Sequence, residues 1–307
     1  MYCVHLTSAT VFATILQSVG GDNVKTAKIQ FLSAMGIFGT VGFFVKFIPL
    51  SSGVIALCRA VLGLAFLAVI MLCQRKRPDF SAIKKNLPVL LISGGIMGMN
   101  WVLLFQSYLH TTVATATVCY YFAPLMLLLA SPLLGERLTP KKLICVAVAL
   151  VGLVCVSGIL KGGLPAPHEL AGVLLGLGAA ALYAGVMFLN KKLSPIPAYD
   201  KTVIQLGSAA AVIALYLLIT GFAPVALTTT QWVLLLVVGI VHTGFAYVLY
   251  FGSMKDLSAK TIALFSYLDP VIAVLLSALL LHESLGVWDW VGTALILGSA
   301  LYSELSE

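Results

Sequence analysis

Titratable residues within long apolar stretches are the first candidates for chemistry in this sequence. Asp269 is the only acidic residue deep within such a stretch. Its carboxylate could exchange a proton or attract an amine, and the alternative is that it caps a helix segment beginning near Pro270. His242 titrates near neutral pH when unperturbed, so it could take part in proton coupling with Asp269. The alternative for His242 is an interhelical hydrogen bond.

Two basic residues, Lys46 and Arg59, also lie within or at the ends of apolar stretches. Either side chain could pair with a carboxylate or attract an anionic group of a ligand. The alternative for Lys46 is structural, because its stem can lie along apolar surface while the ammonium reaches the edge of a membrane. Both residues are candidates for a charge role.

Aromatic and amide side chains form a third group. Aromatic rings bind apolar or cationic ligands through contact area and cation–π interaction. Amides are costly in lipid, so we expect these to face the protein interior. Packing and anchoring at a membrane interface are the alternatives for the rings. The candidates for a ligand cavity on these grounds are Asn100, Trp101, Phe105, Gln106, Tyr121 and Tyr267.

Pro124 and Pro270 are the prolines well inside apolar stretches, and each follows a tyrosine by three residues, Tyr121 and Tyr267. A proline within a helix removes one backbone hydrogen bond and kinks or breaks the helix. In membrane proteins such breaks shape binding cavities and hinges. We therefore predict a gating or cavity-shaping role for this pair, with a static bend needed for packing as the alternative.

Long apolar helices must position these residues. Of the 307 residues, 61% are hydrophobic and 9% are charged, which excludes a water-soluble fold. Continuous apolar runs without period-two alternation favour helices over barrel strands, so we predict an all-α membrane protein. The ten predicted spans are 29–48, 52–73, 87–108, 112–134, 142–160, 170–190, 202–222, 231–252, 258–281 and 286–303.

The basic residues predict the orientation. The net charge of +7 needs no nucleic acid to explain it, because 15 of the 18 Lys and Arg residues lie on one side of the predicted spans. Cytoplasmic loops of membrane proteins carry such an excess, which places both termini in the cytoplasm. Residues 1–28 fit poorly as a span or a secretory signal, and we expect a leader there, with translation beginning near Val24 as one hypothesis.

The two halves of the chain are similar to each other. An offset of 146 residues aligns 101–134 with 247–280, and 11 of these 34 positions are identical. We predict one five-helix repeat over 29–160 and a second over 161–307. An odd number of spans forces the second repeat to enter the membrane in the opposite direction. Inverted repeats of this kind are typical of transporters that work by alternating access.

The motifs resemble those of the EamA family in the drug/metabolite transporter superfamily. The residues that carry the resemblance are Phe38-Gly39 followed by Lys46, Arg59, Tyr120 to Pro124 leading to Gly135 to Thr139, and Tyr267 to Pro270 leading to His282 to Leu285. It implies a ten-helix inner-membrane carrier that exports amino acids, metabolites or toxic amphipathic compounds. The family usually has Trp where Phe38 and Tyr183 stand, so the implied cavity stays aromatic at both positions. His242, in the eighth span, completes the predicted cavity.

These observations predict a secondary transporter, not an enzyme. The six cysteines lack metal-binding spacing, and catalytic and phosphate-binding motifs are absent from the sequence, so we expect no cofactor and no metal. The expected partners are a small-molecule substrate and the lipid bilayer, with protons as a candidate coupling ion and no nucleic acid. A monomer or a homodimer fits equally. The alternatives are a non-transporting membrane sensor or scaffold and an intramembrane enzyme.

Overall fold

The computed structural model describes residues 24–135, 139–157, 160, 166–223, 225–254 and 256–305. All regular structure within these ranges is helical, which confirms the all-α prediction. Residues 1–23 of the expected leader lie outside the described residues, and so do residues 136–138 of the second sequence motif. Residues 24–28, assigned to the leader from sequence, form the first turns of helix α2.

The helices of the first half begin at capped positions. Ser51, Asp79, Thr112 and Thr139 each accept a hydrogen bond from a backbone N–H in the first turn of the helix that follows. Because Asp79 caps α4, this helix begins before the apolar run at 87 and contains Pro88. The elements are α2 (Val24–Lys46), α3 (Ser52–Cys73), α4 (Phe80–His110), α5 (Val113–Tyr120), α6 (Ala123–Leu129), the 3₁₀ turn η1 (Ser131–Leu134) and α7 (Pro140–Val156).

The second half follows the same order with one irregularity. Between α10 and α11 the chain forms a π-helix, η3, in which side chains reach carbonyls five residues back. The elements are α8 (Pro167–Lys191), α9 (Ala198–Thr220), α10 (Thr229–Leu236), η3 (Val237–Phe245), α11 (Ala246–Met254), α12 (Ala259–Ser266), α13 (Leu268–Leu279) and α14 (Val287–Leu305).

Six segments are long and apolar enough to cross a membrane. They are Val24–Lys46, Ser52–Cys73, Phe80–His110, Pro167–Lys191, Ala198–Thr220 and Thr229–Met254. Shorter apolar segments follow in each half, at Val113–Leu129 and Leu264–Leu279, where the chain is interrupted between α5 and α6 and between α12 and α13. The ten-span inverted repeat stays a prediction, although α5 and α12 begin 146 residues apart and α3 and α9 do as well.

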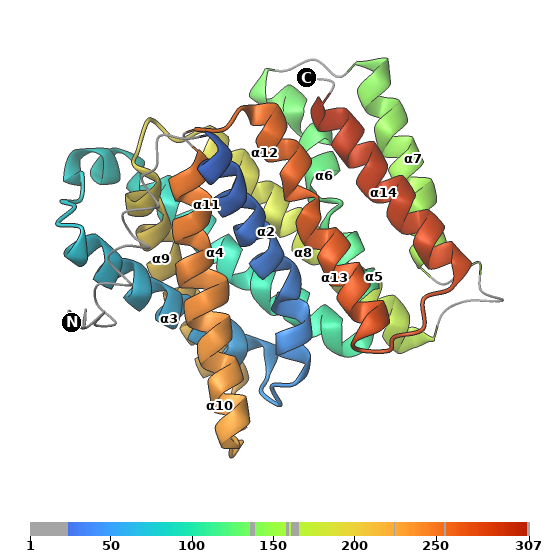
Figure 1. Cartoon of the computed structure of the whole chain (residues 1–307), viewed down its shortest axis with the longest axis horizontal. Helices are drawn as coiled ribbons and strands as arrows, with labels where there is room; N and C mark the ends of the chain where they lie inside the picture. Colours follow the sequence, from blue (N-terminus) through green and yellow to red (C-terminus); the bar gives the residue numbers. More distant parts are fainter. Residues whose placement is uncertain are drawn as a thin grey trace, which may run out of the picture.

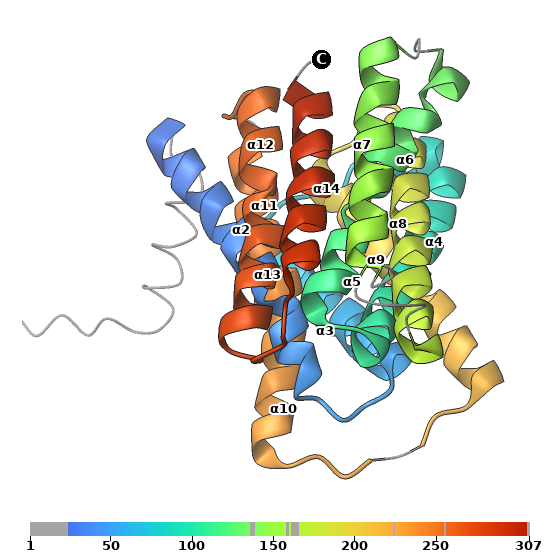
Figure 2. The same cartoon turned by 90° about the vertical axis from the view of Figure 1, so that its right-hand side faces the viewer.

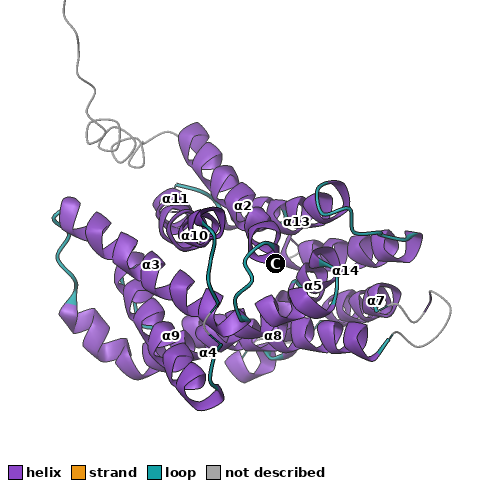
Figure 3. Cartoon of the chain, turned by 90° about the horizontal axis from the view of Figure 1, so that it is seen from below, coloured by secondary structure: helices purple, strands orange, loops and turns teal. Residues whose placement is uncertain are grey.

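Helices α2 and α13 pack against each other between the two ends of the bundle. Helix α2 packs between α11 and α13 (Figure 1), while α3 and α9 lie at one end of the bundle and α7 and α14 at the other (Figure 3). Figure 2 shows α7 running beside α14. A Cβ at Gly39 of α2 would lie 2.6 Å from the carbonyl oxygen of Asp269 in α13. The absence of a side chain there brings the two backbones into contact.

Candidate functional site

Asp269 lies where the two interrupted helices meet. It is in the first turn of α13, and its Oδ2 accepts a hydrogen bond of 2.6 Å from the hydroxyl of Tyr121, the C-cap residue of α5. The carboxylate accepts no hydrogen bond from a backbone N–H of the described residues, so the capping alternative for Asp269 is not what the structure contains. Its side chain is only partly buried. The bond therefore joins the two halves through a carboxylate that is not sealed from its surroundings.

Four tyrosines surround this bond, and we call Tyr120, Tyr121, Tyr183 and Tyr267 the tyrosine cluster. The rings of Tyr120 and Tyr183 stack at 5.2 Å between centroids, and Tyr121 lies 6.1 Å from Tyr267. Tyr183 keeps 37% of its surface exposed, although it contacts a ring from another helix. The hydroxyl of Tyr267 is sealed from water and has no hydrogen-bond partner among the described residues. The cluster presents apolar ring faces and hydroxyls to one carboxylate.

A second group of rings comes from α2 and α11. Phe38 of α2 contacts Tyr247 at 5.7 Å and Tyr250 at 6.1 Å, both on α11. Phe251 contacts the same two tyrosines at 5.6 and 5.1 Å. Tyr247 and Tyr250 are also within electrostatic range of Tyr183 in the tyrosine cluster. The two ring groups therefore lie near each other.

Arg59 lies buried beside these rings, with 6% of its surface exposed. Its Nε donates a hydrogen bond of 2.8 Å to Thr243 Oγ1, and its Cζ lies 4.3 Å from the ring centroid of Trp101 and 5.8 Å from that of Phe105. No carboxylate of the described residues lies within 4.0 Å of the guanidinium. A cation–π contact of this kind contributes on the order of 2 kcal/mol when desolvated. The rings thus stabilise a buried cation that lacks an ion-pair partner.

His242 does not contact Asp269. It is buried in η3, where its Nε2 lies 2.7 Å from Thr40 Oγ1 and its Nδ1 lies 3.2 Å from the carbonyl oxygen of Val237. Thr40 follows Gly39 in α2, and Gly39 is the residue in contact with the Asp269 backbone. The helix α2 therefore lies between the two titratable groups that the sequence suggested as a proton-coupling pair.

Pro124 and Pro270 mark helix interruptions at equivalent places. Pro124 lies in the first turn of α6, and α13 has Pro270 in its first turn. At Tyr121 and at Tyr267 the backbone leaves one helix before the next begins, so each half contains two short helices in place of one kinked helix. Both interruptions border the tyrosine cluster.

The two amides singled out from sequence lie apart from the tyrosine cluster. Asn100 is buried and donates through Nδ2 to the carbonyl of Ala179 at 2.5 Å, which joins α4 to α8. Gln106 accepts a hydrogen bond of 2.9 Å from Ser52 Oγ and lies 3.2 Å from His110 at the end of α4. Each amide thus makes one contact that joins α4 to another helix, and Gln106 also contacts a residue of its own helix.

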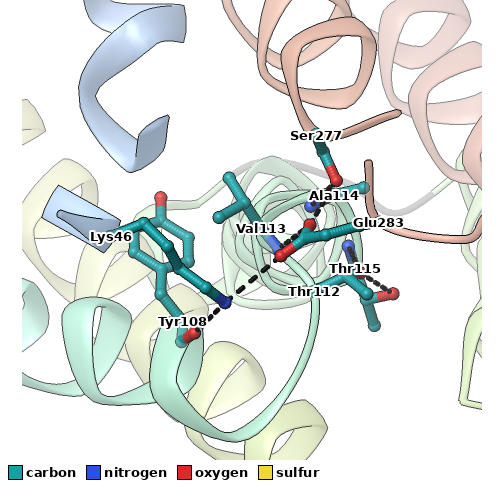
Figure 4. A network of polar contacts seen from close by, with 8 residues as sticks. All are labelled: Lys46, Tyr108, Thr112, Val113, Ala114, Thr115, Ser277 and Glu283. Atoms are coloured by element: carbon teal, nitrogen blue, oxygen red, sulfur yellow. Dashed lines mark hydrogen bonds and ion pairs between the residues drawn. The ribbon is translucent and has the colours of Figure 1, made fainter. Parts of the chain in front are cut away.

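Lys46 belongs to a polar network at the ends of four helices (Figure 4). Its Nζ lies 3.2 Å from Glu283 Oε1 and donates to the carbonyl of Tyr108 at 2.8 Å. Glu283 Oε2 also accepts hydrogen bonds from the backbone N–H of Val113, at 2.8 Å, and from the hydroxyl of Ser277. The ammonium is paired, so the interpretation of Lys46 as a charge that only reaches the membrane edge is incomplete.

Comparison with known proteins places the chain in a family. The model of the EamA-like transporter family matches residues 4–158 and 170–303. The chain belongs to the EamA-like transporter family. Among its relatives is the uncharacterized transporter YxxF of Bacillus subtilis, 30% identical over 290 residues that cover 91% of this chain and 92% of YxxF. The resemblance noted in the sequence is thus confirmed, and the EamA chain is a multi-pass membrane protein.

Two further similarities bear on the EamA chain. The aromatic amino acid exporter YddG of Ancylobacter novellus is 26% identical over 215 residues, which cover 69% of this chain and 74% of YddG. A solved protein crystal structure superposes with a TM-score of 0.64 over 92% of this chain and 98% of its own length, at 22% identity. The structural similarity supports the fold alone.

Several site residues of the EamA chain were not singled out from sequence. Tyr247 is the repeat counterpart of Trp101 at the 146-residue offset, and that equivalence is the signal that identifies it. Glu283 stands in the second copy of the Gly135 to Leu138 motif. Thr40 and Thr243 have no such signal, because threonine is common in apolar helices. Among the described residues, no group of three or more His, Cys, Asp or Glu side chains could hold a metal ion.

Proposed function

We propose that this protein is a secondary transporter that carries a small amphipathic organic molecule across the membrane by alternating access. The observation that carries the proposal is the Tyr121–Asp269 bond, which joins two interrupted helices inside a group of aromatic rings. Interrupted helices at the interface of two repeats are typical sites for substrate in secondary transporters. Rings bind the apolar part of a molecule, while the carboxylate and hydroxyls bind its polar part.

An inverted repeat of five helices in each half is part of this proposal. Equivalent helices begin 146–147 residues apart for α3 and α9, α5 and α12, and α7 and α14. The contacts between helices are also equivalent when the two halves are interchanged. Helix α2 packs on α11, and its counterpart α8 packs on α4. In the same way α3 packs on η3, and its counterpart α9 packs on α4. Such exchanged contacts are expected of two halves related by a pseudo-two-fold axis. In this arrangement α7 and α14, which contact each other, complete ten membrane helices.

The direction we propose is export from the cytoplasm across the inner membrane, with both termini cytoplasmic. The excess of Lys and Arg on one side of the spans supports this orientation. The printed name of the YddG relative, an aromatic amino acid exporter, supports export and an aromatic substrate. Amino acids, other small metabolites and toxic amphipathic compounds are the substrate classes that fit the rings. The proposed unit is a monomer or a homodimer.

Proton coupling is a second element of the proposal, and Asp269 is its candidate residue. The carboxylate is only partly buried and its one hydrogen bond comes from a side chain, so a proton or a substrate amine can replace Tyr121 as its partner. If protons drive transport through Asp269, Asp269→Asn should abolish stimulation by an imposed pH gradient, while counterflow continues at a reduced rate. Equal stimulation in the variant would exclude Asp269 as the coupling residue.

The decisive experiment is counterflow in proteoliposomes. Vesicles that contain the purified protein and unlabelled aromatic amino acids should accumulate the labelled compounds transiently, and vesicles without protein should not. A membrane sensor or scaffold predicts no flux of any compound. An intramembrane enzyme predicts a changed product instead of exchange, which chromatography of the vesicle contents would detect. Absence of counterflow across amino acids, small metabolites and cationic dyes would refute the proposal.

A further inference from the structure

The guanidinium of Arg59 is held in one orientation in the interior of the bundle. Its Nε donates to Thr243 Oγ1 at 2.8 Å, and its Cζ lies over the ring of Trp101, 4.3 Å from the ring centroid. An arginine in such a position keeps its charge, because its guanidinium does not lose a proton in proteins. Thr243 therefore occupies Nε and the Trp101 ring packs against the guanidinium, which leaves the two terminal Nη groups to other partners.

Nothing within the described residues neutralises this charge by direct contact. No carboxylate in the described part of the chain lies within 4.0 Å of the guanidinium. A buried charge without a partner is expensive, and proteins keep one where a ligand or a transported ion supplies the missing charge. Trp101 and Phe105 offset part of this cost through their ring faces. The rest of the cost of burying the Arg59 charge can be offset by a bound anion.

The guanidinium lies near the site of the proposed function. Its terminal Nη groups are not among the buried polar atoms that lack a hydrogen-bond partner in the described residues, and the side chain of Tyr247 lies near the guanidinium. The guanidinium is also within electrostatic range of Tyr120 and of Asp269. These groups come from α11, α5 and α13, so Arg59 lies close to the rings around the Tyr121–Asp269 bond.

We propose that Arg59 binds the carboxylate of the transported molecule, so that the substrates of this carrier are small aromatic or apolar acids. A carboxylate has two oxygens at the spacing of two guanidinium N–H groups and accepts two parallel hydrogen bonds from them. The Tyr247 hydroxyl supplies a further donor beside the guanidinium. The tyrosine cluster then contacts the apolar part of the molecule. This inference rests on the proposed function and adds the charge of the substrate to it.

The arrangement also explains why Asp269 does not satisfy Arg59 itself. Asp269 is hydrogen-bonded to Tyr121 at 2.6 Å and lies beyond ion-pair distance of the guanidinium. A substrate carboxylate fills the position next to Arg59 without competing for that bond. A zwitterionic substrate also has an ammonium group, which can donate a hydrogen bond to the carboxylate of Asp269. An acid without an amine is therefore the minimal substrate, and an amine without an acid is not.

The test uses four probes of similar size and different charge in proteoliposome uptake. They are 3-phenylpropionate, 3-phenylpropionamide, L-phenylalanine and phenethylamine. In the wild-type protein, we expect the two acids to be taken up about tenfold or more faster than the amide and the amine. This factor corresponds to the loss of one hydrogen bond to a charged group. Arg59→Gln should remove that preference, whereas Lys192→Gln, which removes a cation that lies over Phe188, should keep it.

The wild-type ratio of acid to amide needs no variant, so the test stands even where Arg59→Gln fails to fold. Thr243→Val keeps the charge but removes the hydrogen bond to Nε, and it should raise KM for 3-phenylpropionate without changing uptake of the amide. Equal uptake of acid and amide by the wild type overturns the inference and leaves the carrier proposal standing. An unchanged preference in folded Arg59→Gln also overturns it. If none of the four probes moves, both proposals fail for this class of molecule.

Discussion

Substitution of Glu283 is the most direct test of how the helix ends are held together, because this one side chain joins the ends of several helices. Its carboxylate receives the Lys46 ammonium of α2 at 3.2 Å, the Val113 N–H at the start of α5 at 2.8 Å, and the Ser277 hydroxyl of α13. The substitution Glu283→Gln keeps an acceptor oxygen for Val113 but removes the negative charge. The contact between α2 and the end of α13 then loses its electrostatic attraction.

The magnitude follows from the burial of the two partners. The side chain of Glu283 is 12% exposed and that of Lys46 is 33% exposed. An exposed pair contributes about 0–1 kcal/mol, and breaking a buried pair costs about 3–5 kcal/mol. A value of about 1–2 kcal/mol is expected between these limits, since solvent screens the ammonium. If the network holds this end of the bundle closed, the open population rises roughly tenfold, because 1.4 kcal/mol corresponds to a factor of ten.

The assay is labelling of a cysteine introduced at Thr112, next to the network, by a membrane-impermeant maleimide. Glu283→Gln should increase the labelling rate by about tenfold, and the exchanged pair Lys46→Glu with Glu283→Lys should bring it back toward the wild-type rate. Lys192→Gln is the matched control, because it removes one charge outside this network. An unchanged labelling rate in Glu283→Gln, with the protein folded and monodisperse, would refute the reasoning.

Two further predictions concern the centre of the bundle. Tyr121→Phe and Asp269→Asn should each reduce counterflow, and the double variant should lose little more than either one, because both changes remove the same 2.6 Å bond; additive losses in initial rates would contradict this. Gly39→Ala should lower the melting temperature in detergent and slow transport, because the new Cβ would lie 2.6 Å from a backbone oxygen, whereas at Gly36 the nearest atom is 3.9 Å away. Equal melting temperatures for Gly36→Ala and Gly39→Ala would show that α2 and α13 separate freely.

The sequence predicts the helices better than it predicts their interruptions. Apolar length indicates spans at 112–134 and 258–281, and the prolines within them indicate a disturbance. The structure divides each segment into two short helices at Tyr121 and Tyr267, before the prolines themselves. A proline fixes its own φ and removes one donor, but where the chain leaves the helix depends on tertiary partners such as the Asp269 carboxylate.

The composition of the candidate site was predictable, and its pairing was not. Asp269, Tyr121 and Arg59 are conspicuous because polar groups are rare in apolar helices. The Tyr121–Asp269 bond, however, links residues 148 positions apart, and the Arg59–Thr243 bond links residues 184 apart. No local pattern encodes such contacts. The amide of Asn100 shows the same limit, because a polar side chain that must face inward can serve helix packing as well as a ligand.

Helix α2 gives the two titratable groups a mechanical relationship. Gly39 contacts the Asp269 backbone, and the next residue, Thr40, is within hydrogen-bond distance of His242. A rigid helix cannot move away from one of them without changing its contact with the other. Thermodynamic linkage between the two sites is reciprocal. If a ligand at Asp269 changes the proton affinity of His242 by some factor, protonation of His242 changes the affinity of Asp269 for that ligand by the same factor. The two groups can thus act as one thermodynamic unit without a chain of hydrogen bonds between them.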